Sequence, residues 1–215
     1  MNELTLRITE IFYSLQGETR TMGLPTAFIR LTGCPLRCGY CDTAYAFSGG
    51  QMMSLPTILN QVDGFKPHYV TVTGGEPLAQ KNCWPLLVAL CDQGYEVSLE
   101  TSGAIDIASV DPRVVKIIDI KTPASGELGR NLYTNLDCLQ PHDQIKFVLC
   151  DKADYDWAKE FISNRQLAQK THILFSPSFK DLPARELADW IVADNLPVRM
   201  QIQLHKYLWN DEAGR

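Results

Sequence analysis

The chain has 215 residues, of which 45% are hydrophobic and 21% charged, and its formal net charge is −5. This length and composition are typical of one globular domain with a substantial core. The sequence has no basic stripe for nucleic acid, no apolar run near the roughly 20 residues of a membrane span, and no secretory signal in MNELTLRITE. We therefore expect a cytoplasmic protein with neither a nucleic-acid nor a membrane partner.

Short β-branched runs alternate with helical patterns along the chain. Strands are predicted at 27–31, 69–74, 95–100, 114–121, 144–149, 172–176 and 198–204. Helices are predicted at 54–62, 81–93, 152–168 and 183–195. This alternation implies right-handed βαβ crossovers and an α/β fold with six or seven mostly parallel strands, arranged as an open doubly wound sheet or an incomplete barrel.

Distinctive motifs directly follow four of these predicted strands. Three cysteines follow the first strand, GGEP (74–77) follows the second, TSG (101–103) the third and KTPASGE (121–127) the fourth. The carboxyl ends of parallel strands meet at one edge of a sheet, where functional groups gather. We therefore expect these motifs to form one site.

Cys34, Cys38 and Cys41 lie within eight residues of each other, in a chain with seven cysteines. An odd count with three bunched cysteines does not fit a secreted disulfide scaffold and indicates a metal site. The other four stand singly in apolar surroundings and are interpreted as small core residues: Cys83, Cys91, Cys138 and Cys150.

Three interpretations of the bunched cysteines are open from their spacing. A structural zinc site takes four ligands, usually in two pairs, so a distant cysteine or histidine would have to complete it. A redox-active CxxC would leave Cys34 unexplained. A [4Fe–4S] cluster on three thiolates would leave one iron free to bind a small molecule through an amine and a carboxylate.

The CxxxCxxC spacing, with an aromatic residue before the last cysteine, resembles the radical S-adenosylmethionine (SAM) superfamily. TGGEP (73–77) resembles the motif with which that superfamily binds the amino group of SAM. The resemblance implies a cluster on Cys34, Cys38 and Cys41, with SAM on the open iron as the source of a radical that abstracts a substrate hydrogen. It implies that six residues bind the cofactor: Tyr40, Gly74, Gly75, Glu76, Lys121 and Ser176.

Four further stretches are similar to the 7-carboxy-7-deazaguanine synthases of queuosine and deazapurine biosynthesis: SLQGE (14–18), CDTAYAF (41–47), DIKTPASGE (119–127) and HKYLW (205–209). The likeness implies a carbon–nitrogen lyase that contracts the ring of 6-carboxy-5,6,7,8-tetrahydropterin with loss of ammonia. It also implies one domain over 1–215, in which segment 8–20 contacts the substrate and segment 198–215 closes the pocket.

By the same resemblance, seven residues contact the substrate: Leu15, Gln16, Gly17, Glu18, Arg30, Thr73 and His205. The carboxylate of Glu18 suits the N–H donors of a reduced pterin, and the amide of Gln16 suits its ring amides. Arg30 suits the substrate carboxylate, and His205, expected at the end of the last strand, faces the same mouth. Thr43, in the CDT sequence, is implied as a ligand of Mg²⁺ that also touches the substrate.

Further partners implied by the resemblance are an electron donor such as a flavodoxin or ferredoxin, and a second copy of the chain. Three other functions compete with this interpretation. A glycyl-radical activase would share the cluster but is not expected to contain SLQGE or HKYLW. A non-catalytic electron carrier should have a fully ligated cluster, and a zinc-stapled binding module would have no iron at all.

Overall fold

A nine-stranded mixed sheet organises the chain in the computed structural model, which describes residues 4–210, 212 and 214. Its strands are β1 (Thr5–Leu15), β2 (Pro25–Leu31), β3 (Gln51–Ser54), β4 (Tyr69–Gly74), β5 (Glu96–Thr101), β6 (Val115–Asp119), β7 (Gln144–Leu149), β8 (His172–Pro177) and β9 (Arg199–Met200). The helices are α1 (Leu55–Asp63), α2 (Cys83–Asp92), α3 (Lys152–Asn164), α4 (Ala184–Ala193) and α5 (Leu204–Trp209).

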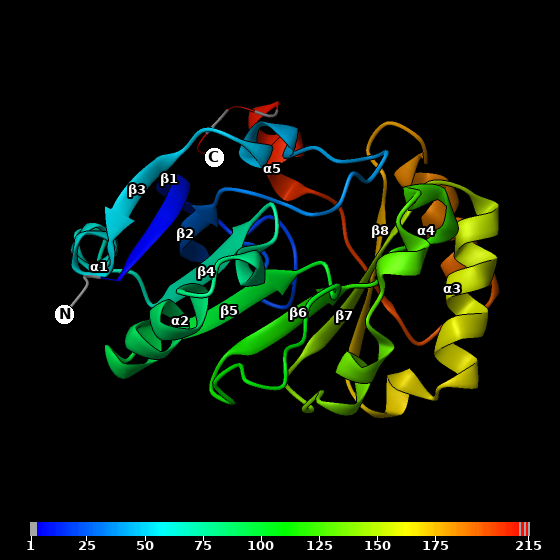
Figure 1. The fold of residues 1–215 in the computed structure, drawn as a ribbon. Helices are drawn as coiled ribbons and strands as arrows, with labels where there is room; N and C mark the ends of the chain where they lie inside the picture. The colour runs from blue at the N-terminus through cyan, green and yellow to red at the C-terminus, as the bar shows by residue number, and fades with distance from the viewer. Residues whose placement is uncertain (1–3, 211, 213, 215) are drawn as a thin grey trace.

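The sheet has the order β3-β1-β2-β4-β5-β6-β7-β8-β9 (Figure 1). From β2 to β9 all neighbouring strands are parallel, whereas β1 pairs antiparallel with both β2 and β3. The prediction of a mostly parallel α/β sheet is therefore confirmed. None of the helices in the described part of the chain is long and apolar enough to cross a membrane.

The two faces of the parallel strands differ in chemistry. Parallel sheets with helices on both faces usually have continuous apolar strands. Here apolar and polar residues alternate: Val72, Leu99 and Phe147 are buried in the hydrophobic core, while Glu100 and Lys146 point to the opposite face. One face is therefore covered by helices, and the other is left to polar side chains.

Residues 16–18, which follow β1, show that the sheet curves into a partial barrel. Within this segment, Gln16 hydrogen-bonds to Thr71 on β4, and Glu18 contacts Lys146 on β7 and Ser176 on β8. One short segment touches β4 and also the neighbouring strands β7 and β8, which are separated from β4 by β5 and β6, so the inner face must be concave.

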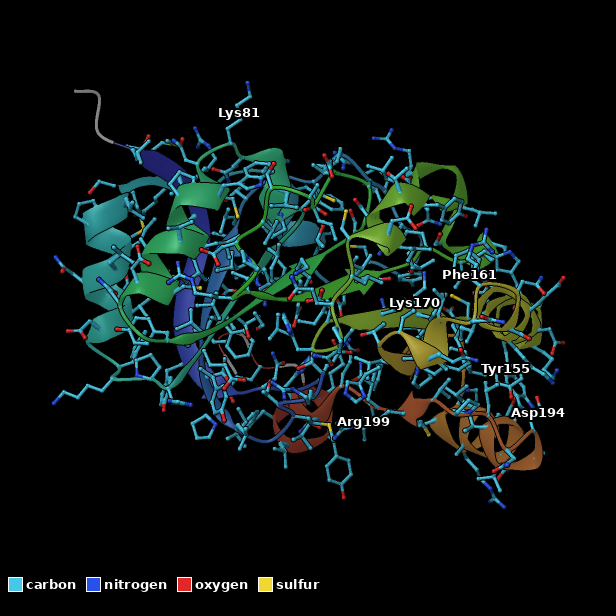
Figure 2. The ribbon with its side chains drawn as sticks, turned by 90° about the horizontal axis from the view of Figure 1, so that it is seen from below. Lys81, Tyr155, Phe161, Lys170, Asp194 and Arg199 are labelled. Carbon is cyan, nitrogen blue, oxygen red and sulfur yellow. The ribbon has the colours of Figure 1, made fainter. Side chains whose placement is uncertain are left out.

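Local signals in the sequence explain several helix ends. The Ser54 hydroxyl accepts a hydrogen bond from Thr57 N at 3.4 Å and caps α1, as its sequence indicated. Asp151 caps α3 by accepting from Asp154 N at 2.8 Å. Helix α3 is held to α4 by Tyr155, whose hydroxyl donates to Asp194 at 2.7 Å (Figure 2).

Two features of the sheet differ from the sequence prediction. Strands β1 and β3 were not predicted; they form the antiparallel edge that lies beside β2. The predicted strand at 198–204 is wrong beyond Met200, because the chain leaves the sheet and forms α5 from Leu204. The backbone N–H of Leu204 donates to Gly17 O at 3.1 Å, which draws α5 onto the segment after β1.

The four single cysteines differ in burial. Cys83 is buried in the core, as predicted, and Cys91 and Cys138 are half-buried and pack against it. Cys150 is half-buried just after β7.

Candidate active site

The cysteine loop (residues 33–42) follows β2 and is fixed mainly through its backbone. Gly33 N donates to Ala46 O at 2.7 Å, and Gly39 N donates to Ser125 O at 3.0 Å. The three thiols are free and half-buried. Burial raises the pKa of Cys34 and of Cys38, although nearby Lys121 opposes this for both thiols. The loop thus presents three thiols, and Lys121 favours the thiolate form of Cys34 and Cys38.

Gly75, directly after β4, lies against the cysteine loop, and Gly74 lies against Leu31, the last residue of β2. A Cβ atom on Gly75 would be within 2.7 Å of Cys34 Cβ, and a Cβ on Gly74 would also overlap the backbone of Leu31. Glu76 N donates to Gly33 O at 2.8 Å. Only glycine permits both approaches, so the pair joins the GGEP motif to the end of β2 and to the loop that carries the thiols.

Glu76 is fully buried and accepts several hydrogen bonds from β5 and the residues that follow it. Its carboxylate accepts from Thr101 Oγ1 at 2.9 Å, from Ser102 N at 2.7 Å and from Ser102 Oγ at 2.5 Å. Leu78 N donates to it at 3.0 Å. The TSG motif therefore holds the glutamate of GGEP in place, which accounts for two of the motifs predicted to share one site.

Tyr40 and Lys121 meet beside the cysteine loop. Lys121 Nζ lies 3.0 Å from Asp119 Oδ2 and 5.6 Å from the centroid of the Tyr40 ring. The Tyr40 hydroxyl and Asp119 Oδ1 are buried without hydrogen-bond partners among the described residues. Burial raises the pKa of Tyr40. Buried polar atoms that lack partners fit a polar cofactor bound next to the three thiols.

The spacing of the thiols bears on the zinc alternative. A zinc ion holds each sulfur ligand at about 2.3 Å, which brings the sulfurs close together. Across the residues that the structure describes, no group of three or more His, Cys, Asp and Glu side chains is arranged to hold one metal ion. A four-iron cluster binds each thiolate to a different iron, so it tolerates a wider spacing.

Residues 16–18 reach the inner face from the N-terminal edge of the parallel strands, opposite to the cysteine loop. Gln16 Nε2 donates to Thr71 Oγ1 at 3.1 Å and to Glu100 Oε1 at 3.4 Å, while its Oε1 accepts from Glu18 N at 3.2 Å. Leu15 ends β1 and pairs with Pro25 at the start of β2. The amide of Gln16 therefore fixes the turn that carries Glu18.

Glu18 is 9% exposed and forms an ion pair with Lys146, whose Nζ lies 2.5 Å from Glu18 Oε2. Ser176 Oγ donates to Glu18 Oε1 at 3.4 Å. The structure thus places Ser176, predicted at the cofactor, against the carboxylate predicted to bind substrate. We refer to six contacting residues on the inner face as the inner polar cluster: Gln16, Glu18, Thr73, Glu100, Lys146 and Ser176.

Glu100 and Lys146 were missed by the sequence analysis. Thr73 Oγ1 donates to Glu100 Oε2 at 3.2 Å. Burial and the nearby Glu18 raise the pKa of Glu100, although Lys146 opposes the shift. Burial alone would lower the pKa of Lys146, but Glu18, Asp119 and Glu100 raise it above its usual value. The signal that could have identified both residues is their position at polar sites that alternate with buried apolar residues of β5 and β7.

Arg30 on β2 forms an ion pair with Glu10, its partner in the register with β1. Its Nε lies 2.7 Å from Glu10 Oε1, which also accepts from the Tyr45 hydroxyl at 2.8 Å. In the register of β2 with β4, Arg30 lies beside Thr73. Two residues predicted to bind substrate are therefore neighbours in the sheet.

Thr43 and Asp42 connect the end of the cysteine loop to the C-terminal segment. Thr43 Oγ1 donates to Asp42 Oδ1 at 2.8 Å, and Gln203 Nε2 donates to Asp42 Oδ2 at 2.6 Å. Burial opposes ionisation, but these bonds and the cations Lys206 and Lys146 hold the pKa of Asp42 well below its usual range. Asp42 is therefore charged at neutral pH.

His205 lies on α5 and not at the end of a strand, so that part of its prediction is wrong. It nevertheless reaches the predicted substrate segment, because a Cβ on Gly17 would lie 2.6 Å from His205 Nδ1. Figure 2 shows α5, in red, next to the blue N-terminal part of the chain. A side chain at position 17 would therefore displace the imidazole of His205.

Comparisons with known proteins agree with this geometry. Residues 28–164 match the Radical SAM superfamily. The chain is 48% identical to the 7-carboxy-7-deazaguanine synthase of Chlorobaculum tepidum, over 98% of this chain and 97% of that protein. It is 44% identical to the 7-carboxy-7-deazaguanine synthase of Koribacter versatilis, over 97% of this chain and 99% of that protein.

Among solved structures, the chain is similar to QueE from Escherichia coli, with a TM-score of 0.77, 24% identity, and coverage of 94% of this chain and 95% of that one. That likeness confirms the partial barrel fold. Membership of the superfamily implies a [4Fe–4S] cluster and SAM, which fit the three free thiols and the buried polar atoms beside them. On the strength of its full-length relatives, the chain belongs to the 7-carboxy-7-deazaguanine synthase family of the radical SAM superfamily.

Proposed function

We propose that the chain converts 6-carboxy-5,6,7,8-tetrahydropterin to 7-carboxy-7-deazaguanine with loss of ammonia. The observation that supports this most strongly is the Glu18–Lys146 pair on the inner face of the barrel, whose side chains are only 12% and 13% exposed. Ion pairs shielded from water contribute little to stability compared with apolar residues of similar size, so a role in binding explains this pair better than a role in stability. Lys146 also acts electrostatically on Asp42 and Asp119, which connects the inner polar cluster to the residues around the thiols.

In this proposal, Cys34, Cys38 and Cys41 bind the cluster, and the GGE sequence (74–76), Tyr40 and Lys121 orient SAM. Ser176 acts with the inner polar cluster through its bond to Glu18. Bound together, the cluster and SAM supply the radical that removes a hydrogen atom from the substrate. The contribution of the chain is positional: Gly75 fixes the cysteine loop, and Glu76 is immobilised by its bonds to Thr101 and Ser102.

Residues of the inner polar cluster bind the pterin ring in this account. The carboxylate of Glu18 accepts from the N–H groups of the cyclic guanidine, and Gln16 contacts the ring beside Glu18. Arg30 and Thr73, which are neighbours across β2 and β4, bind the substrate carboxylate. His205, packed on Gly17, encloses the ring from α5.

We further propose Mg²⁺ at Thr43. The hydroxyl of Thr43 donates its proton to Asp42, so its lone pairs remain available for a cation. Mg²⁺ prefers oxygen ligands and often retains water, so one protein hydroxyl together with substrate oxygens can hold it. The ionised carboxylate of Asp42 adds a negative charge beside this position.

The remaining proposals rest on the family alone. They are a flavodoxin-like or ferredoxin-like electron donor, a homodimer, a cytoplasmic location, and one domain in which segment 8–20 contacts the substrate and segment 198–215 closes over it. Three positions of the latter segment, 211, 213 and 215, lie outside the described residues.

The test is anaerobic incubation of the reconstituted protein with SAM, a reductant and the carboxylated tetrahydropterin, followed by identification of the product. We expect 7-carboxy-7-deazaguanine and 5′-deoxyadenosine. SAM cleavage without that product would reject the proposed substrate. A glycyl radical formed on a partner protein would indicate an activase, and a reconstituted cluster that never cleaves SAM would indicate an electron carrier.

A further inference from the structure

Gln201 has a buried hydrogen-bond donor that no described residue uses. The side chain is 3% exposed, and its Oε1 accepts from Thr19 N at 2.7 Å. Its Nε2 is buried and has no hydrogen-bond partner in the part of the chain that the structure describes. A backbone N–H can only donate, so it must face the amide oxygen, and the NH₂ group points elsewhere. A buried donor without a partner destabilises the protein, and a bound acceptor would remove that penalty.

The position of Gln201 brings this donor next to Glu18. Phe175 on β8 pairs with Met200 on β9, and Gln201 N donates to Phe175 O at 2.9 Å, so Gln201 lies beside Ser176. Ser176 Oγ in turn donates to Glu18 Oε1. The bond from Thr19 to Gln201 is made by the residue that directly follows Glu18. A carboxylate acceptor and a free amide donor are therefore adjacent on the inner face.

This pairing matches one edge of a pterin ring. The 2-amino group and N3–H are donors, and the 4-oxo group next to them is an acceptor. A carboxylate can bind the two donors, and the third position then requires a donor from the protein. We propose that Gln201 is a substrate-binding residue whose Nε2 donates to the 4-oxo group and selects 4-oxo over 4-amino pterins. This inference rests on the proposed function and assigns a residue that the sequence analysis did not consider.

The variant Gln201→Glu tests the donor separately from the turn. A glutamate keeps an oxygen for Thr19 N but replaces the NH₂ donor with a second acceptor. The matched control is Gln144→Glu. Gln144 is 2% exposed, and its Oε1 accepts at 2.9 Å from Arg20 N, the next N–H of the same turn. If Gln201 has only a structural role, Gln201→Glu and Gln144→Glu should change substrate binding to the same extent.

The measurement is the affinity of each reconstituted holoenzyme, at pH 8, for 6-carboxytetrahydropterin and for its 2,4-diamino counterpart. We expect wild type and Gln144→Glu to prefer the 4-oxo compound by at least about tenfold, because the 4-amino compound lacks the N3–H that Glu18 accepts and also places a donor against the Gln201 donor. The contribution of Glu18 is the same in all three proteins. Gln201→Glu should therefore show a clearly smaller preference than wild type and Gln144→Glu, since its carboxylate accepts from the 4-amino group.

Two results would overturn the inference. One is the same preference in Gln201→Glu as in wild type. The other is equal affinity of wild type for the two compounds, a result that does not depend on whether the variant folds. Failure of wild type to bind either pterin would instead reject the proposed function itself.

Discussion

The cysteine loop and the inner polar cluster lie in the same barrel but are assembled in different ways. The three cysteines fall within one short loop, held by backbone hydrogen bonds and by close contact with Gly75. The inner polar cluster joins distant parts of the chain: Glu18 contacts Lys146 and Ser176, which are 128 and 158 residues away. One region thus depends on backbone geometry, and the other on buried side-chain bonds. Substitutions should separate cofactor chemistry from substrate recognition.

The largest expected effect is the loss of any one of Cys34, Cys38 and Cys41. Replacement by Ala should abolish cluster retention and reductive cleavage of SAM, because each thiolate is proposed to bind a different iron. Iron content after anaerobic reconstitution and formation of 5′-deoxyadenosine measure the two effects.

The matched controls are Ser replacements of the four other cysteines: Cys83, Cys91, Cys138 and Cys150. Each should retain the cluster, although Cys83→Ser should lower stability because its side chain is fully buried. An essential cysteine among these four would contradict a three-thiolate cluster.

Glu76→Gln should have the next largest effect, on stability as well as on the cofactor. The substitution puts an NH₂ donor where the carboxylate now accepts from Thr101 and Ser102. Hydrogen bonds to a buried charge contribute more than neutral ones, so the free energy of unfolding should fall by about 2–4 kcal/mol. Denaturant unfolding of the protein without cofactor measures this.

Glu96→Gln is the control for that measurement. Glu96 also pairs with a cation, Arg20, but its side chain is 39% exposed, and exposed pairs contribute roughly 0–1 kcal/mol. Similar small losses in both variants would show that Glu76 does not hold the GGEP motif in place.

Thr43→Ala should have an intermediate effect that is confined to substrate turnover. If Thr43 holds Mg²⁺ against the substrate carboxylate, the variant should need roughly tenfold more Mg²⁺ or should cleave SAM without forming product. The measurement is a titration of Mg²⁺ into chelator-treated wild type and variant, following product and 5′-deoxyadenosine together. Identical curves that do not depend on the metal would remove Mg²⁺ from the account.

The smallest expected effect is a pH-dependent gain in stability from Glu100→Gln. The pKa of Glu100 is raised in the folded protein. When the pH rises above the ordinary pKa of a glutamate, the unfolded chain releases the carboxyl proton while the folded protein still holds it. Stability is therefore lost as pH rises from the unfolded to the folded pKa, and the full penalty applies above the latter.

Glu100→Gln removes this penalty. It should be more stable than wild type at neutral pH, and the difference should vanish at acid pH, where both states are protonated. Unfolding at a series of pH values measures it. A difference that grows on acidification would show that the carboxylate of Glu100 is stabilised in the fold, contrary to the direction of its pKa shift.

The same contrast explains what could be predicted from the sequence. Strand and helix periodicity located the parallel strands β2 and β4–β8 and the helices α1–α4, and the cysteine spacing located the loop, because these signals are local. The pairing of Glu18 with Lys146 is set by the curvature of the sheet, which has no local signal. Helix α5 was missed because its position depends on a distant contact with Gly17.

Glu18→Gln tests the separation of the two regions most directly. The variant keeps the shape of the side chain but turns one acceptor into a donor that faces the donors of the pterin, which should weaken substrate binding by about 1–3 kcal/mol. The measurement is the yield of 5′-deoxyadenosine without substrate and the yield of product with it, in wild type and variant. We predict an unchanged first yield and a strongly reduced second, because the cysteine loop and the GGEP motif do not contact Glu18. An equal loss of both yields would contradict the account.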